Sequence, residues 1–402
     1  MSQNFLSQRV LGIEPSPSIA ANALVNQLRA QGKDIVNFTI GEPDLDTPEH
    51  ILEAARVAMS NGDTHYTNTN GTLALREAIV KKLSRDNDVH YALDEVIAGC
   101  GGKHIIYHAL AATLNAGDEV VVHTPYWVSY PDIAKLNDAT PVIIPGNESN
   151  GFKLTPGELD AAITPNTKWV ILNTPNNPSG AVYTEAELSS LAVVLRKYPH
   201  VLIMSDEIYE HFVYGDAKHV SFVKAAPDLK ERTLILNGAS KGYAMTGWRL
   251  GFGAGPKFLI AAIAKLLSQT TTCPSSISQA AAVAAFAGDQ SPIAHMREIY
   301  IERRQRMLDL LKDVKGVSCT PPDGAFYVYA NVSKLIGLKT PAGKVIESDS
   351  DLVSFLLEEE GVATVSGAAY GMSPYVRLSF ASAMDVIEEG CLRFKRACNK
   401  LS

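Results

Sequence analysis

The sequence has few cysteines and no excess of basic residues. Its five cysteines are scattered and odd in number, and no two of them are separated by a two-residue gap. Such a set is neither a disulfide framework nor a zinc ribbon, and we expect no metal site. Lysine and arginine number 36 against 43 acidic residues, a formal net charge of −7. This balance argues against a protein that follows the phosphates of a nucleic acid.

Long hydrophobic runs are also lacking. The most apolar region, 258–286, is interrupted by Lys265 and by a run of serine and threonine, so we expect no membrane span. The first residues contain neither a long apolar stretch nor a small-residue cleavage site. We therefore expect a cytoplasmic protein that binds neither nucleic acid nor a membrane. Its 402 residues, 46% of them apolar, are enough for two or three domains with a large core.

Short apolar runs alternate with helical patterns through the middle of the chain. We predict strands at 119–123, 141–144, 169–172, 201–204 and 233–236. Between them, 185–196 is a typical helix, because Thr184 is a suitable cap with Glu187 three residues later. This alternation predicts an α/β fold whose mostly parallel sheet is covered by helices on both faces. Such a sheet binds ligands at the carboxyl ends of its strands.

The two ends of the chain have a different character. The first 46 residues are polar and contain several prolines. From about 290, a charged helical stretch leads to an aromatic strand after Gly324 and finally to an amphipathic helix at 384–399. We predict a large domain at 47–289 and a smaller α+β domain formed by 1–46 and 290–402.

Lys241 and Asp206 each follow a predicted strand. A lysine in a loop is most often a surface charge, but Lys241 lies among small residues and is followed by Arg249. A lysine removed from water beside a fixed cation is activated for imine formation, and Arg249 is also suited to a phosphate. Asp206 either caps a helix or pairs with a protonated pyridine nitrogen, with Tyr209 as a nearby phenol.

Three other segments have weaker signals. The glycines before Lys103, in Gly99-Cys-Gly-Gly-Lys103, leave backbone N–H groups free for a phosphate, although the segment lacks the pattern of a nucleotide P-loop. The turn Pro175-Asn-Asn-Pro-Ser-Gly180 needs no function, yet Asn177 is able to present its amide to a ring hydroxyl. Trp127 is either a core residue or a side chain that stacks on a planar ring.

Taken in order, these motifs resemble one family. Ser-Lys-Gly-Tyr-Ala-Met-Thr-Gly-Trp-Arg-Leu-Gly at 240–251 is the most specific of them. Gly-Glu-Pro-Asp (41–44), Pro-Asn-Asn-Pro-Ser-Gly (175–180), Asp-Glu-Ile-Tyr (206–209) and Val-Arg-Leu-Ser (376–379) accompany it. From about residue 5 to 400 the chain resembles the class I pyridoxal-phosphate aminotransferases of fold type I, in the branch that contains bacterial aspartate aminotransferases.

The resemblance implies pyridoxal 5′-phosphate as cofactor and a role for each matching residue. Lys241 would form an imine with the cofactor and then move a proton, Asp206 would keep the ring nitrogen protonated, and Trp127 would stack on the ring. Asn177 and Tyr209 would bind the ring oxygen. The phosphate would meet Gly102, Lys103, Ser240, Arg249 and, from a second subunit of a homodimer with shared active sites, Tyr66. The substrate would meet Gly41, Trp127, Asn177, Lys103 and Arg377, whose planar guanidinium fits the α-carboxylate.

The resemblance also implies a reaction and leaves its substrates open. We expect an amino group to pass from an L-amino acid to a 2-oxo acid by a ping-pong mechanism, with aspartate and 2-oxoglutarate as first choices. In that reading Lys103 meets the distal carboxylate of aspartate. Two positions depart from the family: Gly238 replaces a phosphate-binding serine, for which Ser240 or water would substitute, and Glu14 stands where relatives often have a basic residue.

Several alternatives remain open at this stage. They are an aminotransferase for aromatic residues, kynurenine, glutamine or alanine, and a lyase on the same fold. A ligand-sensing regulator would need an added DNA-binding unit, for which the first 46 residues are too short and not basic. A binding protein without cofactor would give a colourless sample.

Overall fold

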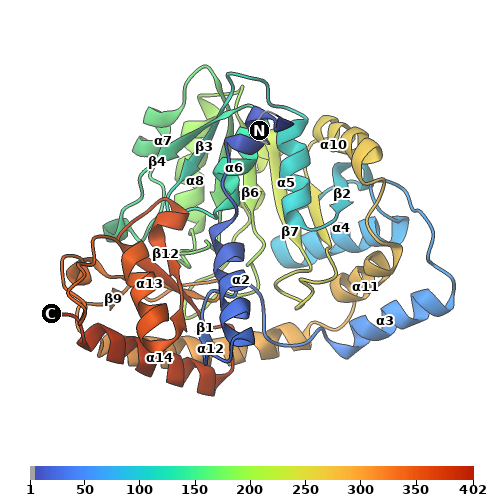
Figure 1. Ribbon diagram of the computed structural model, residues 1–402. Coiled ribbons are helices and arrows are strands. Elements are labelled where there is room, and N and C mark those ends of the chain that lie inside the picture. The colour runs from blue at the N-terminus through green and yellow to red at the C-terminus, as the bar shows by residue number, and fades with distance from the viewer. Residues whose placement is uncertain (1–4) are drawn as a thin grey trace.

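A seven-stranded sheet forms the centre of the computed structural model, which describes residues 5–402 (Figure 1). The strands lie in the order β2-β8-β7-β6-β5-β3-β4, and all neighbours are parallel except the two pairs that include β8. Their bounds are β2 (Val96–Gly99), β3 (Glu119–His123), β4 (Thr140–Ile144), β5 (Thr167–Asn173), β6 (Leu202–Asp206), β7 (Thr233–Gly238) and β8 (Gly251–Ala254). The predicted mostly parallel sheet is confirmed.

Helices cover both faces of this sheet because successive side chains of a strand point to opposite sides. Val120 packs in the cluster that includes α5 (Gly102–Ala111), α6 (Ser129–Leu136) and α10 (Lys257–Thr270). Its neighbour Val121 packs in the cluster of α7 (Pro156–Ala162), α8 (Glu185–Arg196) and α9 (Phe222–Ala225). A third group packs beside β2 and β8, namely α3 (Glu49–Ser60), α4 (Leu73–Asn87) and α11 (Ser276–Ala287).

Local sequence patterns predicted the bounds of several helices and strands to within a few residues. Helix α8 has its predicted bounds, and Thr184 and Glu187 exchange the two hydrogen bonds of a capping box. The five predicted strands correspond to β3 through β7. Strand β6 begins one residue later than predicted and continues to Asp206, whose side chain therefore belongs to the end of a strand rather than to a loop.

Segments from both termini form a second, smaller unit. The short strand β1 (Val36–Asn37) pairs in parallel with β11 (Val362–Ala363), and Phe38 shares a core with Tyr327 and Phe394. A four-stranded antiparallel sheet lies in the order β12-β13-β10-β9. Its strands are β12 (Val365–Ser366), β13 (Tyr375–Ser379), β10 (Tyr327–Asn331) and β9 (Ser318–Cys319). The α+β character is confirmed, and the boundaries at 47 and 290 stay a prediction.

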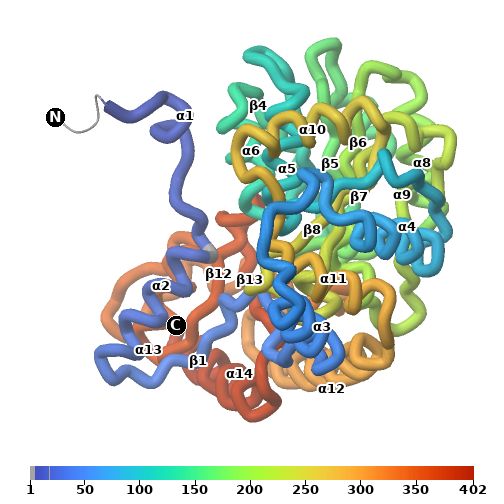
Figure 2. Tube along the Cα trace, turned by 90° about the vertical axis from the view of Figure 1, so that its right-hand side faces the viewer, coloured from blue at the N-terminus to red at the C-terminus, as the bar shows by residue number. Residues whose placement is uncertain are grey.

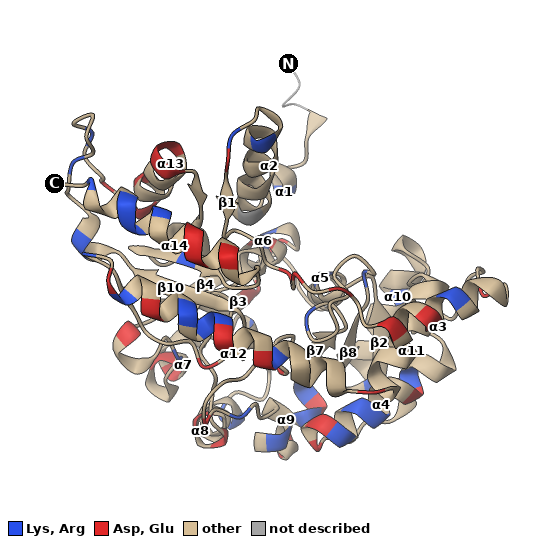
Figure 3. Ribbon diagram, turned by 90° about the horizontal axis from the view of Figure 1, so that it is seen from below, with Lys and Arg blue, Asp and Glu red and all other residues tan. Residues whose placement is uncertain are grey.

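The remaining helices lie mainly around this smaller unit (Figure 1). They are α1 (Gln8–Leu11), α2 (Pro17–Ala30), α12 (Ser291–Lys312), α13 (Asp349–Glu360) and α14 (Met384–Asn399). Short 3₁₀ turns lie at Leu93–Glu95, Glu148–Asn150, Pro227–Arg232, Ser333–Leu335 and Gly367–Tyr370. Acidic and basic residues are interspersed along α12 and α14, as Figure 3 shows, and Arg306 pairs with Glu388 across the two helices.

The N-terminal segment extends away from α2 and reaches the end of α6. Figure 2 shows α1 at the end of an extended segment that leads to α2. An ion pair between Arg9 and Asp138 ties α1 to the end of α6, while Phe5 is 90% exposed. Within residues 5–402, none of the helices is long and apolar enough to cross a membrane.

Candidate active site

The carboxyl ends of three neighbouring strands bring the predicted residues together. Strands β5, β6 and β7 are parallel, and Asn173 at the end of β5 is paired in register with Asp206 at the end of β6. Lys241 follows the end of β7 by three residues, and Asn177 lies in the turn after β5. Because parallel strands end at one edge of a sheet, these side chains face the same region.

Asp206 is a buried carboxylate with a defined set of donors. Only 4% of its surface is exposed. The phenol of Tyr130 donates to Oδ2 at 2.6 Å, and the backbone N–H of Ile208 donates to Oδ1 at 3.2 Å. Burial raises the pKa of Asp206 to about 6, while the bond from Tyr130 acts in the opposite direction. The carboxylate is thus costly to keep charged unless a cation binds beside it.

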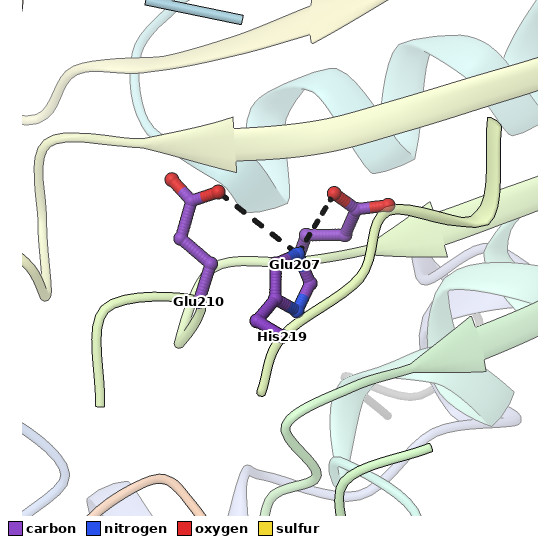
Figure 4. A group of neighbouring side chains, drawn as sticks. All are labelled: Glu207, Glu210 and His219. Carbon is purple, nitrogen blue, oxygen red and sulfur yellow. Dashed lines mark hydrogen bonds and ion pairs between the residues drawn. The ribbon is translucent and has the colours of Figure 1, made fainter. Parts of the chain in front are cut away.

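A buried polar cluster holds the turn that follows Asp206. Figure 4 shows His219 between Glu207 and Glu210, with its Nε2 3.2 Å from Glu207 Oε2 and 4.0 Å from Glu210 Oε2. These three side chains could together ligate a cation. However, the Lys82 ammonium already pairs with Glu210, which lowers the pKa of that carboxyl. We therefore interpret the cluster as an internal support for the turn.

Lys241 is a partly buried amine with a lowered pKa. Its Nζ donates to the carbonyl of Gly41 and lies 6.0 Å from the centre of the Tyr209 ring. Burial lowers the pKa of Lys241 to about 8, opposed by the nearby charge of Glu42 and reinforced by that of Arg377. A larger share of this amine is neutral, and so nucleophilic, near neutral pH than for an ordinary lysine.

Arg377 reaches the same region from the smaller sheet. It lies in β13 and is buried, and its guanidinium donates to the Thr39 carbonyl at 2.7 Å and to Asn177 Oδ1 at 3.1 Å. The ring of Tyr327 stacks 4.3 Å from the guanidinium carbon. The Nε of Arg377 is buried and has no hydrogen-bond partner within residues 5–402. A buried, incompletely paired guanidinium fits an incoming carboxylate.

Tyr209 and Tyr327 connect the two sheets at this point. Their hydroxyl groups are 2.9 Å apart, and both rings are buried. Neighbouring Asn177 is also buried, and its backbone N–H donates to Asn173 Oδ1 at 3.0 Å. The amide Nδ2 of Asn177 and the phenol of Tyr209 therefore come from two different loops that are each fixed by other contacts.

The start of α5 forms a cradle for an anion. Gly101, the residue before the helix, has a φ of +90°. A Cβ atom there would lie 2.5 Å from Nη2 of Arg249, so only glycine lets the guanidinium approach the loop. The N–H groups of Gly102 and Lys103 have no acceptor in the described part of the chain. Free N–H groups at a helix start beside a guanidinium suit a phosphate.

The structure leaves little room for a serine at position 238. A Cβ atom on Gly238 would lie 2.8 Å from Gly251 Cα and 2.9 Å from the Leu250 carbonyl oxygen. The antiparallel pairing of β7 with β8 brings the two glycines face to face. Ser240, which is buried two residues later, remains the candidate hydroxyl.

Lys103 and Trp127 lie in contact with each other, whereas Tyr66 and Glu14 are exposed to solvent elsewhere. The Nζ of Lys103 is 4.9 Å from the centre of the Trp127 indole, and burial lowers the pKa of Lys103. Tyr66 is 86% exposed. Glu14 is also exposed, in the segment between α1 and α2.

Sequence reasoning missed three residues of this site. They are Thr39, Tyr130 and Tyr327. Tyr130 stands three residues after Trp127, at helical spacing, and their rings meet edge to face 5.3 Å apart. That spacing was the available signal. The contacts of Thr39 and Tyr327 join distant segments and had no local signal.

The fold is α/β, and its candidate site gathers an amine with a lowered pKa, a buried carboxylate and a buried, incompletely paired guanidinium. The family model "Aminotransferase class I and II" matches residues 33–394. The chain therefore belongs to the class I and II aminotransferase family and is an aminotransferase.

Several relatives match nearly the whole chain. An aspartate/prephenate aminotransferase of Cereibacter sphaeroides is 47% identical over 99% of this chain and 100% of the relative. The crystal structure of an aspartate aminotransferase from Rhizobium meliloti matches with a TM-score of 0.96 and 43% identity, covering 99% of each chain. The Thermus thermophilus aspartate aminotransferase with maleate matches with a TM-score of 0.91 and 38% identity, covering 98% of this chain and 99% of that one.

Proposed function

We propose that this aminotransferase uses pyridoxal 5′-phosphate to transfer the amino group of aspartate to 2-oxoglutarate. The observation that carries the proposal is the placement of Lys241 and Asp206 on adjacent strand ends, beside the cradle of Gly101 and Arg249. This arrangement offers an amine for an imine, a carboxylate for a pyridine nitrogen and donors for a phosphate. When bound, the cofactor supplies an electron sink for the bond broken at the substrate Cα.

The residues of this chain would then divide the work by position. The carboxylate of Asp206 would hold a proton on the ring nitrogen. The resulting cation would offset the cost of burying the charge of Asp206. The Nζ of Lys241 would remove the proton from Cα of the amino donor. In the second half of the cycle it would deliver a proton to Cα of the acceptor, a role suited to a pKa of about 8.

Other residues would orient the two ligands. Asn177 and Tyr209 would donate to the ring oxygen, and Trp127 would lie on the ring face. Gly102 and Lys103, through backbone N–H groups, would bind the phosphate together with Ser240 and Arg249. Arg377 would bind the α-carboxylate of the substrate, close to the backbone of Gly41.

Aspartate is favoured as donor by Lys103 and by the names of the relatives. A cation beside Trp127 is suited to a second carboxylate at the far end of a substrate. Maleate, the molecule named with the Thermus thermophilus structure, has two carboxylates. Because a relative is named for aspartate and prephenate, prephenate is the second candidate oxo acid.

We further propose a homodimer with shared active sites and a cytoplasmic location. The exposed apolar residues Phe5, Leu6, Val10 and Leu11 on the N-terminal arm favour a second copy as partner, and exposed Tyr66 would reach the phosphate of that copy. None of the five cysteines forms a disulfide, which agrees with a reducing compartment. Mass measurement at micromolar concentration tests the dimer, and an active monomer would contradict it.

One assay separates the candidate substrates. Purified enzyme is supplied with aspartate, alanine, glutamine, kynurenine and an aromatic donor, each against 2-oxoglutarate, pyruvate, oxaloacetate and prephenate. The pairs of aspartate with oxaloacetate and of alanine with pyruvate are left out, because they give no net product. We expect aspartate with 2-oxoglutarate to give the highest kcat/KM. A colourless protein without an absorbance change on addition of amino acid would overturn the cofactor assignment. A product formed without an oxo acid would indicate a lyase.

A further inference from the structure

The loop before α5 is held by an unusual helix-capping contact. Gly101, at the N-cap position, has no side chain with which to bind the first N–H groups. Instead, Nδ1 of His104, the third residue of the helix, accepts the N–H of Cys100 at 3.1 Å. This contact resembles half of a capping box, in which a glutamate or glutamine at the third position reaches back to the start of the helix.

The geometry determines the charge of His104. Since Nδ1 accepts a backbone N–H, it cannot carry a proton, so the ring proton is on Nε2. Nε2 is 2.8 Å from Thr271 Oγ1 and donates to it. The imidazole in this arrangement is neutral. Burial agrees with this state, because it lowers the pKa of His104 to about 4.

The contact leaves the useful N–H groups of the loop available. The N–H of Gly101 donates to the Gly99 carbonyl at 2.8 Å, and that of His104 donates to the Gly101 carbonyl at 3.1 Å. Cys100 is bound by the imidazole, whereas the N–H groups of Gly102 and Lys103 have no acceptor within residues 5–402. They adjoin His104 directly in the helix.

We propose that His104 is a positioning residue that shapes the phosphate loop through a neutral acceptor and so spares the bound anion a nearby negative charge. The inference rests on the phosphate site of the proposed function. A glutamate at this position would make the same backbone contact, but its charge would repel a phosphate dianion within the same helical turn. At such distances the repulsion corresponds to about a tenfold loss of affinity.

The test compares an uncharged and a charged acceptor of the same shape. Inorganic phosphate is titrated into full-length apoenzyme of the wild type, His104→Gln and His104→Glu, and binding is measured by calorimetry and by competition with the cofactor. We expect His104→Gln to stay within about twofold of the wild type and His104→Glu to bind about tenfold more weakly. His104→Asn and His104→Asp repeat the comparison if the glutamate variant does not fold.

A matched pair on the same helix controls for added charge. Tyr107 is exposed on α5, three residues beyond His104, so Tyr107→Glu and Tyr107→Gln should differ by less than about twofold because solvent screens the more distant charge. Equal phosphate affinity of His104→Gln and His104→Glu would overturn the inference, as would an equal loss in Tyr107→Glu. Failure of the wild type to bind phosphate or cofactor would instead overturn the proposed function.

Discussion

The phenol of Tyr130 donates a 2.6 Å hydrogen bond to Oδ2 of Asp206, and both side chains are buried. The two residues are 76 positions apart and come from α6 and β6. The bond orients the carboxylate and offsets part of the cost of burying its charge. Asp206 is therefore oriented to pair with a cation although burial still raises its pKa.

The raised pKa of Asp206 predicts a pH-dependent stability of the apoenzyme. Between about pH 4 and pH 6 the folded protein keeps a proton that the unfolded chain releases, so raising the pH destabilises the fold. The loss amounts to up to about 3 kcal/mol and is absent in Asp206→Asn. Urea unfolding of both proteins at pH 4.5 and pH 7 measures the difference. Parallel stability profiles would contradict a raised pKa.

The same substitution should remove the destabilisation at neutral pH but slow catalysis. Asp206→Asn is expected to bind cofactor but to lose roughly three orders of magnitude in kcat, about 4 kcal/mol of barrier, because an amide does not hold a proton on the ring nitrogen. Single-turnover absorbance changes measure the loss. Near-normal rates would show that Asp206 serves only to support the turn.

Lys241→Ala should abolish turnover and the link to the cofactor that borohydride reduces. In the wild type, the neutral fraction of this amine should grow as the pH rises through about 8, because its pKa is lowered to that value. Mass spectrometry after reduction, across a pH series, reports both results. Lys265→Ala, an exposed lysine on α10, is the control. Retention of more than a few per cent of activity in Lys241→Ala would refute the assignment.

A serine placed at position 238 should harm this protein. In Gly238→Ser the new Cβ meets the backbone of Gly251 and Leu250 at under 3.0 Å, a crowding that costs about 1–3 kcal/mol of stability. Gly247→Ser is the matched control, since nothing lies within 4 Å of its added Cβ. Thermal melts compare the two. Tighter cofactor binding without loss of stability in Gly238→Ser would show that β8 moves aside.

Substitutions of Lys103 and of Arg377 should impair different sets of amino donors. Lys103→Ala is expected to raise KM for aspartate about ten- to a hundredfold while sparing alanine, because only aspartate has a distal carboxylate. Arg377→Ala should impair every donor alike. Because Lys103 also begins the phosphate loop, cofactor affinity of Lys103→Ala is measured alongside. Equal losses for aspartate and alanine with intact cofactor binding would remove Lys103 as the specificity residue.

Much of the candidate site could be predicted from the sequence because its residues stand at the ends of recognisable elements. Lys241 and Asp206 follow short apolar strands, and Gly101 precedes a helix, so each could be assigned from local pattern and resemblance. The same holds for helix α8, whose capping residues lie three positions apart. The covered, mostly parallel sheet followed from the alternation of these elements.

Contacts between distant segments were decided only by the tertiary structure. Arg377 meets Thr39 because the segment after β1 runs beside the end of β13, where the N–H of Ser379 donates to the Phe38 carbonyl at 3.0 Å. It meets Asn177 because the turn after β5 reaches the same strand. The pKa values of Asp206 and Lys241 depend on burial, which no local pattern specifies. Gly238 tolerates no serine because β8 passes against it. The order of residues determined the chemical groups and the elements that carry them, whereas packing determined their distances, charges and partners.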